Sequence, residues 1–399
     1  MPARNTEAIN LLVKIDGKEE LKFGKGGTDT WKLKNGMMVH SLHIDMRLDC
    51  PDAFEVQFHA EREGKLIVFD WAQAGKPIEL GFSYEKKPQP LFKGEIVYCE
   101  VDHDSEPDVP SLVSLRGYDH SHRLTRGHMA KTWGDGENAD QTISDIVKKI
   151  LSEESKDDEL QAGDSKADQE PFKSRYIPHA MSTRYDFIKW AGSNLARASD
   201  SESEDDKKIA FRKLDVKSNP VATICYEKIE GSNPARTISA RFSISTFPSY
   251  TKVRVHGWNI KEKKAFVGEA EACSPEIDCA SANSGWKPGW EQSKEALYKG
   301  GEGAVYERVL EFCETKEEAK KIAQGLFDSF SLRFLTGEIE VVGCPEIVPG
   351  SIVELKGFGE RLSGKVIVTQ AAHHYSIDGA KPYTTRLQFC ANASGPTKS

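Results

Sequence analysis

Apolar and polar residues alternate in short runs through the first third of the chain. The clearest runs cover residues 78–84 and 111–118, and a third, at residues 91–98, follows the turn-forming sequence Lys-Pro-Gln-Pro. A period of two is the pattern of a strand with one buried face. Shorter runs lie at residues 54–58 and 65–69. Many short strands separated by turns predict a first β-barrel over residues 1–125.

The period changes to that of a helix between residues 126 and 235. Apolar residues recur at helical spacing over residues 139–151 and predict one helix with a single buried stripe. A second helix is predicted over residues 183–198, because Thr183 is a suitable N-cap and Asp186 follows three positions later. Strand-like runs at 208–214 and 222–227 complete a small α/β domain, residues 126–235.

Strand-like alternation returns after residue 236. It is clear at residues 239–246 and 252–258. It resumes at residues 351–356, 364–370 and 384–389. These runs predict a second β-barrel made of residues 236–265 and 336–396.

The residues between the two parts of this barrel, 266–335, are predicted to be an insertion. Its first part, residues 269–303, shows no clear secondary structure. Its second part carries the strongest helix signal in the chain, since Thr315 and Glu318 form a capping box. The apolar face of this helix consists of Ala319, Ile322, Ala323, Leu326, Phe327 and Phe330.

The fold class that follows is mainly β with α+β elements. It contains two β-barrel domains, one intervening small α/β domain and a helix-containing insertion in the second barrel. The similar size of the two β regions suggests an internal duplication. Their sequences do not repeat, so this hypothesis rests on layout alone.

The charge of the chain is acidic, with a formal net charge of −8 among 399 residues. Phosphate backbones are bound mainly by Lys and Arg, so direct nucleic-acid recognition is not expected. Much of the acid lies in residues 153–170 and 199–208, which have few apolar residues and are predicted to be mobile loops.

The sequence contains no run of about 18 apolar residues, so no membrane partner is predicted. Its first ten residues lack a basic segment followed by an apolar stretch, so no signal peptide is predicted either. We therefore expect a protein that is synthesised in the cytoplasm.

Eight cysteines are scattered without a Cys-x-x-Cys pair. In a protein made in the cytosol, such residues are expected to be buried thiols that behave as small apolar side chains. Cys273 and Cys279 are close in sequence, but two soft ligands without a nearby third make a weak metal site.

Histidine offers a second possible metal site. His120 and His122 stand two positions apart, with Asp119 and His128 nearby. The alternative, which we favour, is that these residues form a polar loop after the strand at residues 111–118. The same loop interpretation applies to Asp102-His103-Asp104 and to His373-His374, and adjacent histidines on a strand point to opposite faces. No metal or cofactor is predicted.

The sequence also offers little evidence of a catalytic motif. The sequence has neither a Gly-x-Ser-x-Gly nucleophile elbow nor a His-Glu-x-x-His motif. The segment Gly-Lys-Gly-Gly-Thr at residues 24–28 lacks the spacing of a phosphate-binding loop and is expected to be a hairpin loop. No Asp or Glu lies in an apolar stretch that would raise its pKa, and most lie in charged loops. The chain is therefore predicted to be non-enzymatic, with no catalytic residues.

Four short segments occur in a fixed order along the chain. The first is Ser-Leu-Arg-Gly-Tyr-Asp at residues 114–119, followed by Thr132-Trp133. The next are Ser-Thr-Arg-Tyr-Asp-Phe-Ile-Lys-Trp at residues 182–190 and Val-Arg-Val-His-Gly-Trp-Asn at 253–259. The last runs from Val-Pro-Gly at residues 348–350 through Leu-Ser-Gly-Lys-Val to His373-His374-Tyr375. In this order the segments resemble the phage late control protein D family and the N-terminal hub part of VgrG proteins, although Lys365-Val366 replaces an aromatic residue common in the family.

This resemblance implies a fold, an assembly and partners. Members build two β-barrels per chain and form a homotrimer, which joins a hexameric inner tube protein to a trimeric spike protein. Baseplate wedge or LysM-type adaptor proteins are further implied partners, in the baseplate of a phage tail or injection particle. Because the chain ends soon after the last predicted strand, the spike is expected to be a separate polypeptide.

The family's motif residues have architectural roles in this interpretation. Gly117, Gly257, Gly350 and Gly364 are expected at turns or bulges where a side chain would clash. Trp258 is expected to be a core residue.

Two other functions stay open: a tail-associated cell-wall hydrolase, and a monomeric β-rich adaptor that binds effectors or carbohydrate. The kind of machine is open too, since a phage, a headless bacteriocin and a protein-delivering injection system would all use such a hub.

Overall fold

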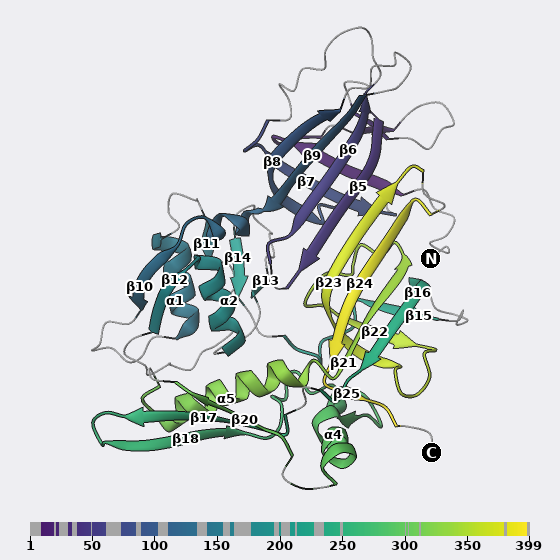
Figure 1. Ribbon diagram of the computed structural model, residues 1–399. Coiled ribbons are helices and arrows are strands. Elements are labelled where there is room, and N and C mark those ends of the chain that lie inside the picture. Colours follow the sequence, from purple (N-terminus) through teal and green to yellow (C-terminus); the bar gives the residue numbers. More distant parts are fainter. Residues whose placement is uncertain are drawn as a thin grey trace.

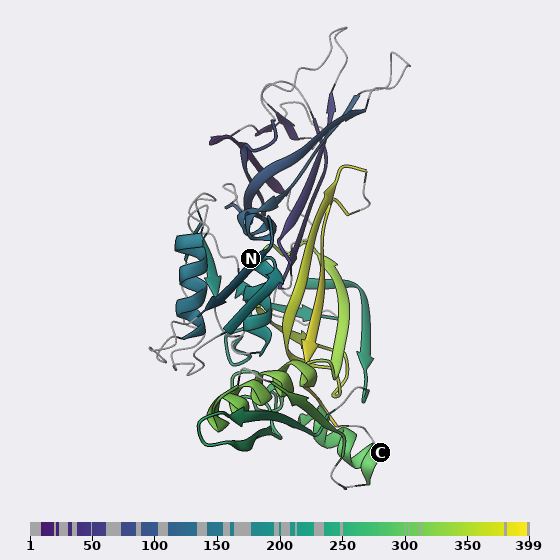
Figure 2. The ribbon, with the colours of Figure 1, turned by 60° about the vertical axis from the view of Figure 1, so that its left-hand side comes forward.

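The chain forms an elongated molecule in which β structure dominates (Figures 1 and 2). The computed structural model describes residues 9–19, 21–23, 31–33, 38–48, 50–60, 73–84, 89–102, 111–133, 142–154, 160–162, 177–194, 199–200, 208–211, 214–226, 235–247, 250–299, 301, 303–310, 313–378 and 381–396. The predicted loop at 24–28, the strand at 65–69, His103, Asp104 and most of both acidic stretches lie outside these residues. No helix among the described residues is long and apolar enough to cross a membrane.

The first β unit is an antiparallel sheet curled around its own core at the upper end of Figure 1. Its six main strands follow the order β1-β7-β8-β9-β6-β5. Alternate residues point inward, so the side chains of Val13, Leu42, Val56 and Leu115 are fully buried. The strands are β1 (Asn10–Ile15), β5 (Met38–Arg47), β6 (Ala53–Ala60), β7 (Pro77–Ser83), β8 (Phe92–Asp102) and β9 (Ser111–Asp119), with the short β2 (Lys18–Glu19), β3 (Leu21–Phe23) and β4 (Trp31–Leu33) beside them.

The second β unit is a closed six-stranded barrel. Its order is β23-β22-β15-β16-β21-β24, and β24 pairs back with β23. Closure removes most of the free sheet edge. The strands are β15 (Ala222–Cys225), β16 (Ala235–Ile244), β21 (Leu335–Val342), β22 (Ile352–Lys356), β23 (Gly364–Ser376) and β24 (Tyr383–Ala391).

The two β units repeat one strand arrangement. The antiparallel order β5-β6-β9-β8-β7 in the first unit corresponds, strand by strand in chain order, to β16-β21-β24-β23-β22 in the second. The leading strands differ, since β1 runs antiparallel to β7 whereas β15 runs parallel to β22. This shared order supports the internal duplication that the sequence layout suggested.

One long strand joins the two units into a single 15-stranded sheet. The second half of β23 pairs with β5, from Gln370↔Arg47 to Ser376↔Ser41. The core of the first unit accordingly includes Tyr375 and Tyr383 from the second. The two units therefore cannot separate without breaking a ladder of backbone hydrogen bonds.

The α/β unit lies beside the first β unit (Figure 1). The buried stripe predicted for its first helix is confirmed at Ile146, Val147, Ile150 and Leu151. That helix begins later than predicted, because Thr142 caps it in a capping box with Asp145. The elements are β10 (Met129–Trp133), α1 (Ile143–Lys149) with a π-helical turn (Ile150–Glu154), β11 (Gln161–Ala162), β12 (Ile177–Ser182), α2 (Arg184–Asn194), β13 (Ser199–Asp200) and β14 (Lys208–Phe211).

The insertion forms the lower end of the molecule. Its helix α5 (Lys316–Ser331) confirms the predicted capping box of Thr315 and Glu318, and its predicted apolar face is buried except for the half-buried Phe330. Helix α5 covers one face of a three-stranded sheet, β18-β17-β20. These strands are β17 (Lys252–Asn259), β18 (Lys264–Ala270) and β20 (Val305–Val309), and nearby lie α3 (Cys279–Ala282), β19 (Lys287–Pro288), α4 (Gly289–Tyr298) and β25 (Ala393–Ser394).

The fold class is confirmed, but two strands lie elsewhere than the sequence boundaries placed them. Strand β15, assigned to the α/β domain, pairs with β22 and β16 in the second barrel. Strand β17, assigned to that barrel, pairs with β18 and β20 in the insertion. Alternation shows that a strand has one buried face but does not identify its partner. Residues 269–303, predicted to lack secondary structure, contain α3, β19 and α4.

The motif residues were predicted with mixed success. Gly350 has a φ of 80° in a turn, and Gly117 lies opposite a bulge in β8. Gly257 instead lies within β17, where an added Cβ would come within 2.3 Å of the Phe266 ring. The core placement of Trp258 was wrong, because its side chain is 50% exposed. Strand alternation turns Gly257 toward α5 and Trp258 away from it.

Candidate assembly surfaces

A buried histidine stands at the seam between the two β units. His373 is completely buried in β23, so the loop predicted for His373-His374 was wrong, although the two side chains do point to opposite faces. Its Nε2 lies 3.0 Å from the carbonyl oxygen of Ile347, and its Nδ1 lies 2.9 Å from the Tyr383 hydroxyl. A carbonyl only accepts hydrogen bonds, so Nε2 carries the proton and Nδ1 accepts from Tyr383.

Burial keeps this histidine neutral, lowering the pKa of His373 from its ordinary 6.5 to about 4. The ring of Tyr383 stacks on Phe82 of the first unit, with centroids 4.4 Å apart. The neutral imidazole therefore fixes a tyrosine that comes from the second unit and packs in the core of the first.

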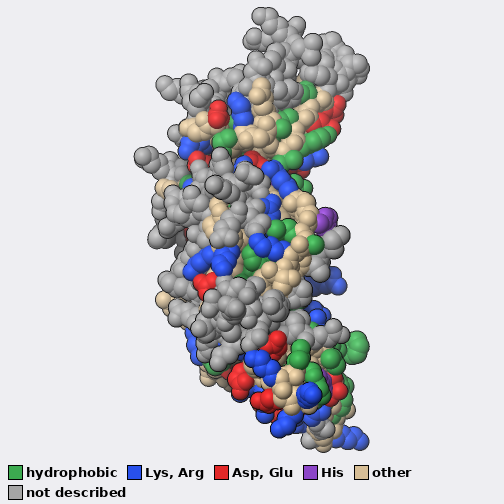
Figure 3. Space-filling view, turned by 90° about the vertical axis from the view of Figure 1, so that its left-hand side faces the viewer, with side chains coloured by type: hydrophobic (Ala, Val, Ile, Leu, Met, Phe, Trp, Pro, Cys, Tyr) green, Lys and Arg blue, Asp and Glu red, His purple; other side chains and the backbone are tan. Residues whose placement is uncertain are grey.

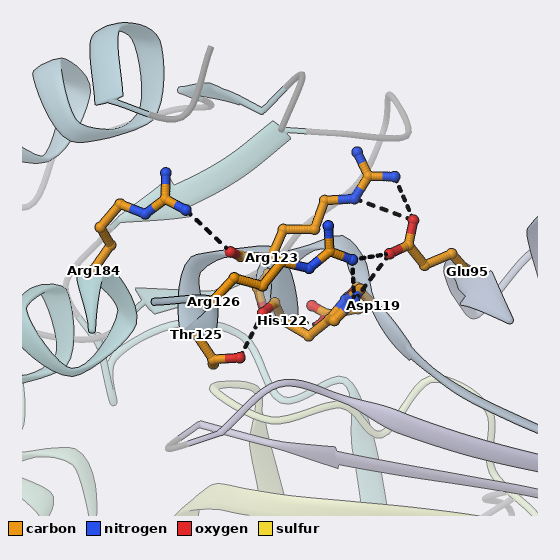
Figure 4. A network of polar contacts seen from close by, with 8 residues as sticks. Glu95, Asp119, His122, Arg123, Thr125, Arg126 and Arg184 are labelled. Carbon is orange, nitrogen blue, oxygen red and sulfur yellow. Dashed lines mark hydrogen bonds and ion pairs between the residues drawn. The ribbon is translucent and has the colours of Figure 1, made fainter. Parts of the chain in front are cut away.

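A second buried polar group links the first β unit to the α/β unit (Figure 4). Glu95 lies on β8 and is 4% exposed. Its Oε1 accepts from Arg126 Nη2 at 2.9 Å and lies 2.9 Å from His122 Nε2, while Oε2 accepts from the guanidinium of Arg123. The three basic residues belong to, or directly follow, a 3₁₀ helix (His120–Thr125) that leaves β9.

The charges around Glu95 decide its protonation state. Burial alone raises the pKa of its carboxyl group. The hydrogen bond and charge of Arg123, assisted by the charges of His122 and Arg126, outweigh that effect and hold the pKa below its ordinary value. On the other side of the 3₁₀ helix, Arg184 of α2 donates to the Arg123 carbonyl oxygen at 3.3 Å. The network thus connects β8 of the first β unit, the 3₁₀ helix and α2 of the α/β unit.

The predicted polar loop at His120 and His122 is therefore an ordered helix. His120 is buried, and His122 uses both ring nitrogens, since Nδ1 lies 2.7 Å from the Asp119 carbonyl oxygen. His128 is exposed. In the part of the chain that the structure describes, no three His, Cys, Asp or Glu side chains are arranged to hold a metal ion.

The cysteines behave as the sequence predicted. Five are buried and three are half-buried, and all eight are free thiols. Burial raises the pKa of Cys279 and of Cys313 to about 12. Thiols held protonated in this way are poor nucleophiles and poor metal ligands.

A groove of about 740 Å³ lies where the second barrel, the end of β5 and the end of α5 meet. Arg47, Arg241 and Arg333 line it, together with the single carboxylate Glu338. Apolar lining comes from Phe242, Leu332 and Phe389. The groove therefore suits an anionic ligand or segment with some apolar character.

The sequence had not indicated the Glu95 network. The pKa of Glu95 is lowered, so Glu95 does not overturn the expectation that no carboxyl group sits where its pKa would be raised; the buried Glu318 does, because burial raises its pKa. The available signal for the network was an acidic residue in a strand, together with two arginines three positions apart.

The fold of the chain is similar to the folds of phage tail proteins and of a type VI secretion component. The prophage MuSo2 43 kDa tail protein from Shewanella oneidensis has a TM-score of 0.61 and 13% identity over 96% of this chain and 98% of its own. A tail protein from Neisseria meningitidis MC58 has a TM-score of 0.62 and 16% identity over 96% and 97%. The E. coli c3393 protein, a component of the type VI secretion system, has a TM-score of 0.52 and 10% identity over 97% and 77%.

At the level of sequence, the chain belongs to the family described as the Alg8 N-terminal domain, whose model matches residues 66–376. No curated protein sequence matches the chain.

Proposed function

We propose that the protein is a structural hub in the baseplate of a phage-like contractile tail or contractile injection system. Three copies would form a ring that adapts a hexameric inner tube to a threefold spike. The fold supports this role, because the similarity to each of two tail proteins covers 96% of this chain. These identities are low, so partners and copy number belong to the proposal.

The observation that carries the proposal is the repeated strand order of the two β units. Three chains that each hold two similar units present six similar lobes. A closed ring needs repeated interfaces, and duplication within the chain converts threefold symmetry into approximate sixfold symmetry. A single-domain trimer would offer a hexameric tube only three equivalent positions.

The joints between units suit this mechanical role. The ladder between β23 and β5 fixes the spacing of the two lobes. The Glu95 network fixes the α/β unit against the first lobe. A hub that transmits force from a tube to a spike needs such rigid joints.

We also infer that the protein is not an enzyme. Among the described residues, three groups of types used in catalysis have structural roles or are buried: arginines neutralise Glu95, Tyr383 and a backbone carbonyl hold His373, and Cys279 is buried. A cell-wall hydrolase would need a carboxyl group available to its substrate.

The test is the mass of the purified protein by light scattering, alone and mixed with its tube and spike proteins. The proposal predicts a mass of three chains, about three times 44.4 kDa. A protein that stays monomeric even with both partners would contradict the hub and favour a monomeric adaptor. Turnover of purified peptidoglycan would favour the hydrolase.

A further inference from the structure

The face of the β18-β17-β20 sheet that points away from α5 has two unlike halves. In the half nearer α4, Lys252 and Arg254 form ion pairs with Glu269, Glu271 and Glu307. In the half nearer the β17–β18 turn, the outward side chains are His256, Trp258, Ala265, Val267 and Val309, and the imidazole of His256 lies 3.8 Å from Glu307. Trp258 is 50% exposed and Val309 is 73% exposed, so much of both side chains is open to solvent.

The β17–β18 turn adds charge to this apolar half. Ile260 in the turn is 70% exposed, and Lys261, Lys263 and Lys264 around it are also exposed. Among the described residues, no ion pair involves any of these three lysines. The same turn also holds the exposed Glu262, so the three lysines leave a net positive rim around an apolar patch, which we name the hairpin patch.

A surface of opposite character lies on the outer face of β8 and β9. Tyr98 is 48% exposed and Tyr118 is 44% exposed. Glu100 and Asp102 follow Tyr98 on the same face of β8 and are exposed. Arg116 lies opposite Tyr98 in this patch, forms an ion pair with Glu55 at 2.8 Å, stands 5.6 Å from the centroid of the Tyr98 ring and is also attracted by the charge of Glu100. No ion pair within 4 Å joins Glu100 or Asp102 to a described cation. We name these four residues, Tyr98, Tyr118, Glu100 and Asp102, the tyrosine patch.

The two patches cannot meet within one chain. Strands β8 and β9 lie in the upper unit and β17, β18 and β20 at the opposite end in both ribbon views (Figures 1 and 2). In Figure 3, hydrophobic side chains lie beside acidic ones on the upper unit, and at the lower end they lie among both Lys or Arg and Asp or Glu side chains. Each patch thus combines exposed aromatic or aliphatic groups with a net charge, which is negative for the tyrosine patch and positive for the hairpin patch.

We propose that the hairpin patch of one copy docks on the tyrosine patch of the next copy, head to tail. Unlike patches at opposite ends of a chain form a heterologous contact, which closes into a ring when the rotation between copies permits. The number of copies in that ring rests on the proposed hub function. Contact between Trp258 and the two tyrosines would supply the apolar core, and the lysines would face Glu100 and Asp102 across the rim.

The test is charge reversal with rescue, read by light scattering over a series of protein concentrations. Reversing Lys261, Lys263 and Lys264 to Glu should weaken association by at least about tenfold. Glu100→Lys with Asp102→Lys should weaken it to a similar extent. Combining both sets should restore most of the wild-type affinity, which misfolding of either variant could not do. Reversal of the exposed Lys217, Lys299 and Lys381 serves as the matched control and should leave the mass unchanged.

The outcomes separate this contact from the hub itself. If the wild-type protein is a trimer and neither charge reversal changes its mass, the proposed contact is wrong and the hub proposal stands. Equal weakening by the control reversals would also overturn it, since net charge alone would then explain the effect. A wild-type chain that is monomeric with and without its tube and spike would overturn both proposals.

Discussion

The side-chain amide of Gln370 donates a 2.6 Å hydrogen bond to Oδ1 of Asp45, a residue 325 positions earlier in the chain. The bond crosses the seam where β23 of the second unit meets β5 of the first. A second bond across the same seam runs from the Tyr84 hydroxyl to the Gly343 carbonyl oxygen at 3.0 Å. Such long-range contacts make the two similar β units behave as one body.

The first prediction concerns the buried hydrogen bond at this seam. Tyr383→Phe removes the hydroxyl that donates to Nδ1 of His373, which leaves a buried polar atom with poorer partners. The free energy of unfolding should fall by about 1–3 kcal/mol. Urea denaturation measures it, with Tyr298→Phe, at an exposed tyrosine, as the control. Equal stability of the two variants would contradict the assigned bond.

A second prediction is a loss of stability in mild acid that depends on His373. Its pKa is about 4 in the folded protein and 6.5 when unfolded, so between these values the unfolded state binds more protons. Stability therefore rises with pH across this window, and His373 alone should contribute about 2 kcal/mol between pH 5 and pH 7.

Comparison with His373→Gln isolates this contribution, because other histidines, including His43 and His374, also have lowered pKa values. The variant should be less stable at pH 7 and should show a flatter dependence on pH by urea denaturation. Parallel pH profiles for the two proteins would show that folding does not lower the pKa of His373.

The third prediction tests the Glu95 network. Glu95→Ala leaves Arg123 without the carboxylate that neutralises it in a site 16% exposed. We expect a loss of about 3–5 kcal/mol of unfolding free energy, as for other broken buried ion pairs. The matched control is Glu79→Ala, which removes a more exposed pair with Lys14 and should cost below about 1 kcal/mol.

Limited proteolysis gives an independent readout for the same pair of variants. Loss of Glu95 should expose the 3₁₀ helix, residues 120–125, to cleavage, because its arginines no longer hold it to β8. If Glu95→Ala and Glu79→Ala have equal stability and equal cleavage patterns, the network does not join the two units.

The fourth prediction concerns the packing of the insertion. Gly257→Ala would drive a methyl group against the ring of Phe266 and the Cys313 carbonyl oxygen. The expected cost is about 1–3 kcal/mol, as for other overpacked cores. Lys264→Ala, at an exposed position of the paired strand, is the control and should change the thermal midpoint little.

Local elements of this fold could be predicted from the sequence, but their partners could not. Helix α5 was located with its caps because Thr315, Glu318 and the apolar stripe all act within a few turns of each other. Strand β15 was recognised as a strand, yet its partner β22 lies far along the chain, since Ala222 pairs with Val353, 131 positions later. The pairing depends on closing a barrel around a long insertion, which no local pattern encodes.

The Glu95 network was not predicted from the sequence, for a related reason. Glu95 and Arg123 are 28 positions apart and meet only because β8 and β9 pair and the chain then turns back. Trp258 was assigned to a core because aromatic residues in strands are often buried. Its actual direction follows from which face of β17 the helix α5 covers, and that is decided by tertiary packing.

The most direct test of the hub is to count lobes in class averages of the purified, assembled protein by negative-stain electron microscopy. We predict a threefold ring with six peripheral lobes of similar size, two from each chain. A ring with only three lobes, or a closed assembly of another symmetry, would contradict the claim that the duplicated β units match a threefold spike to a sixfold tube.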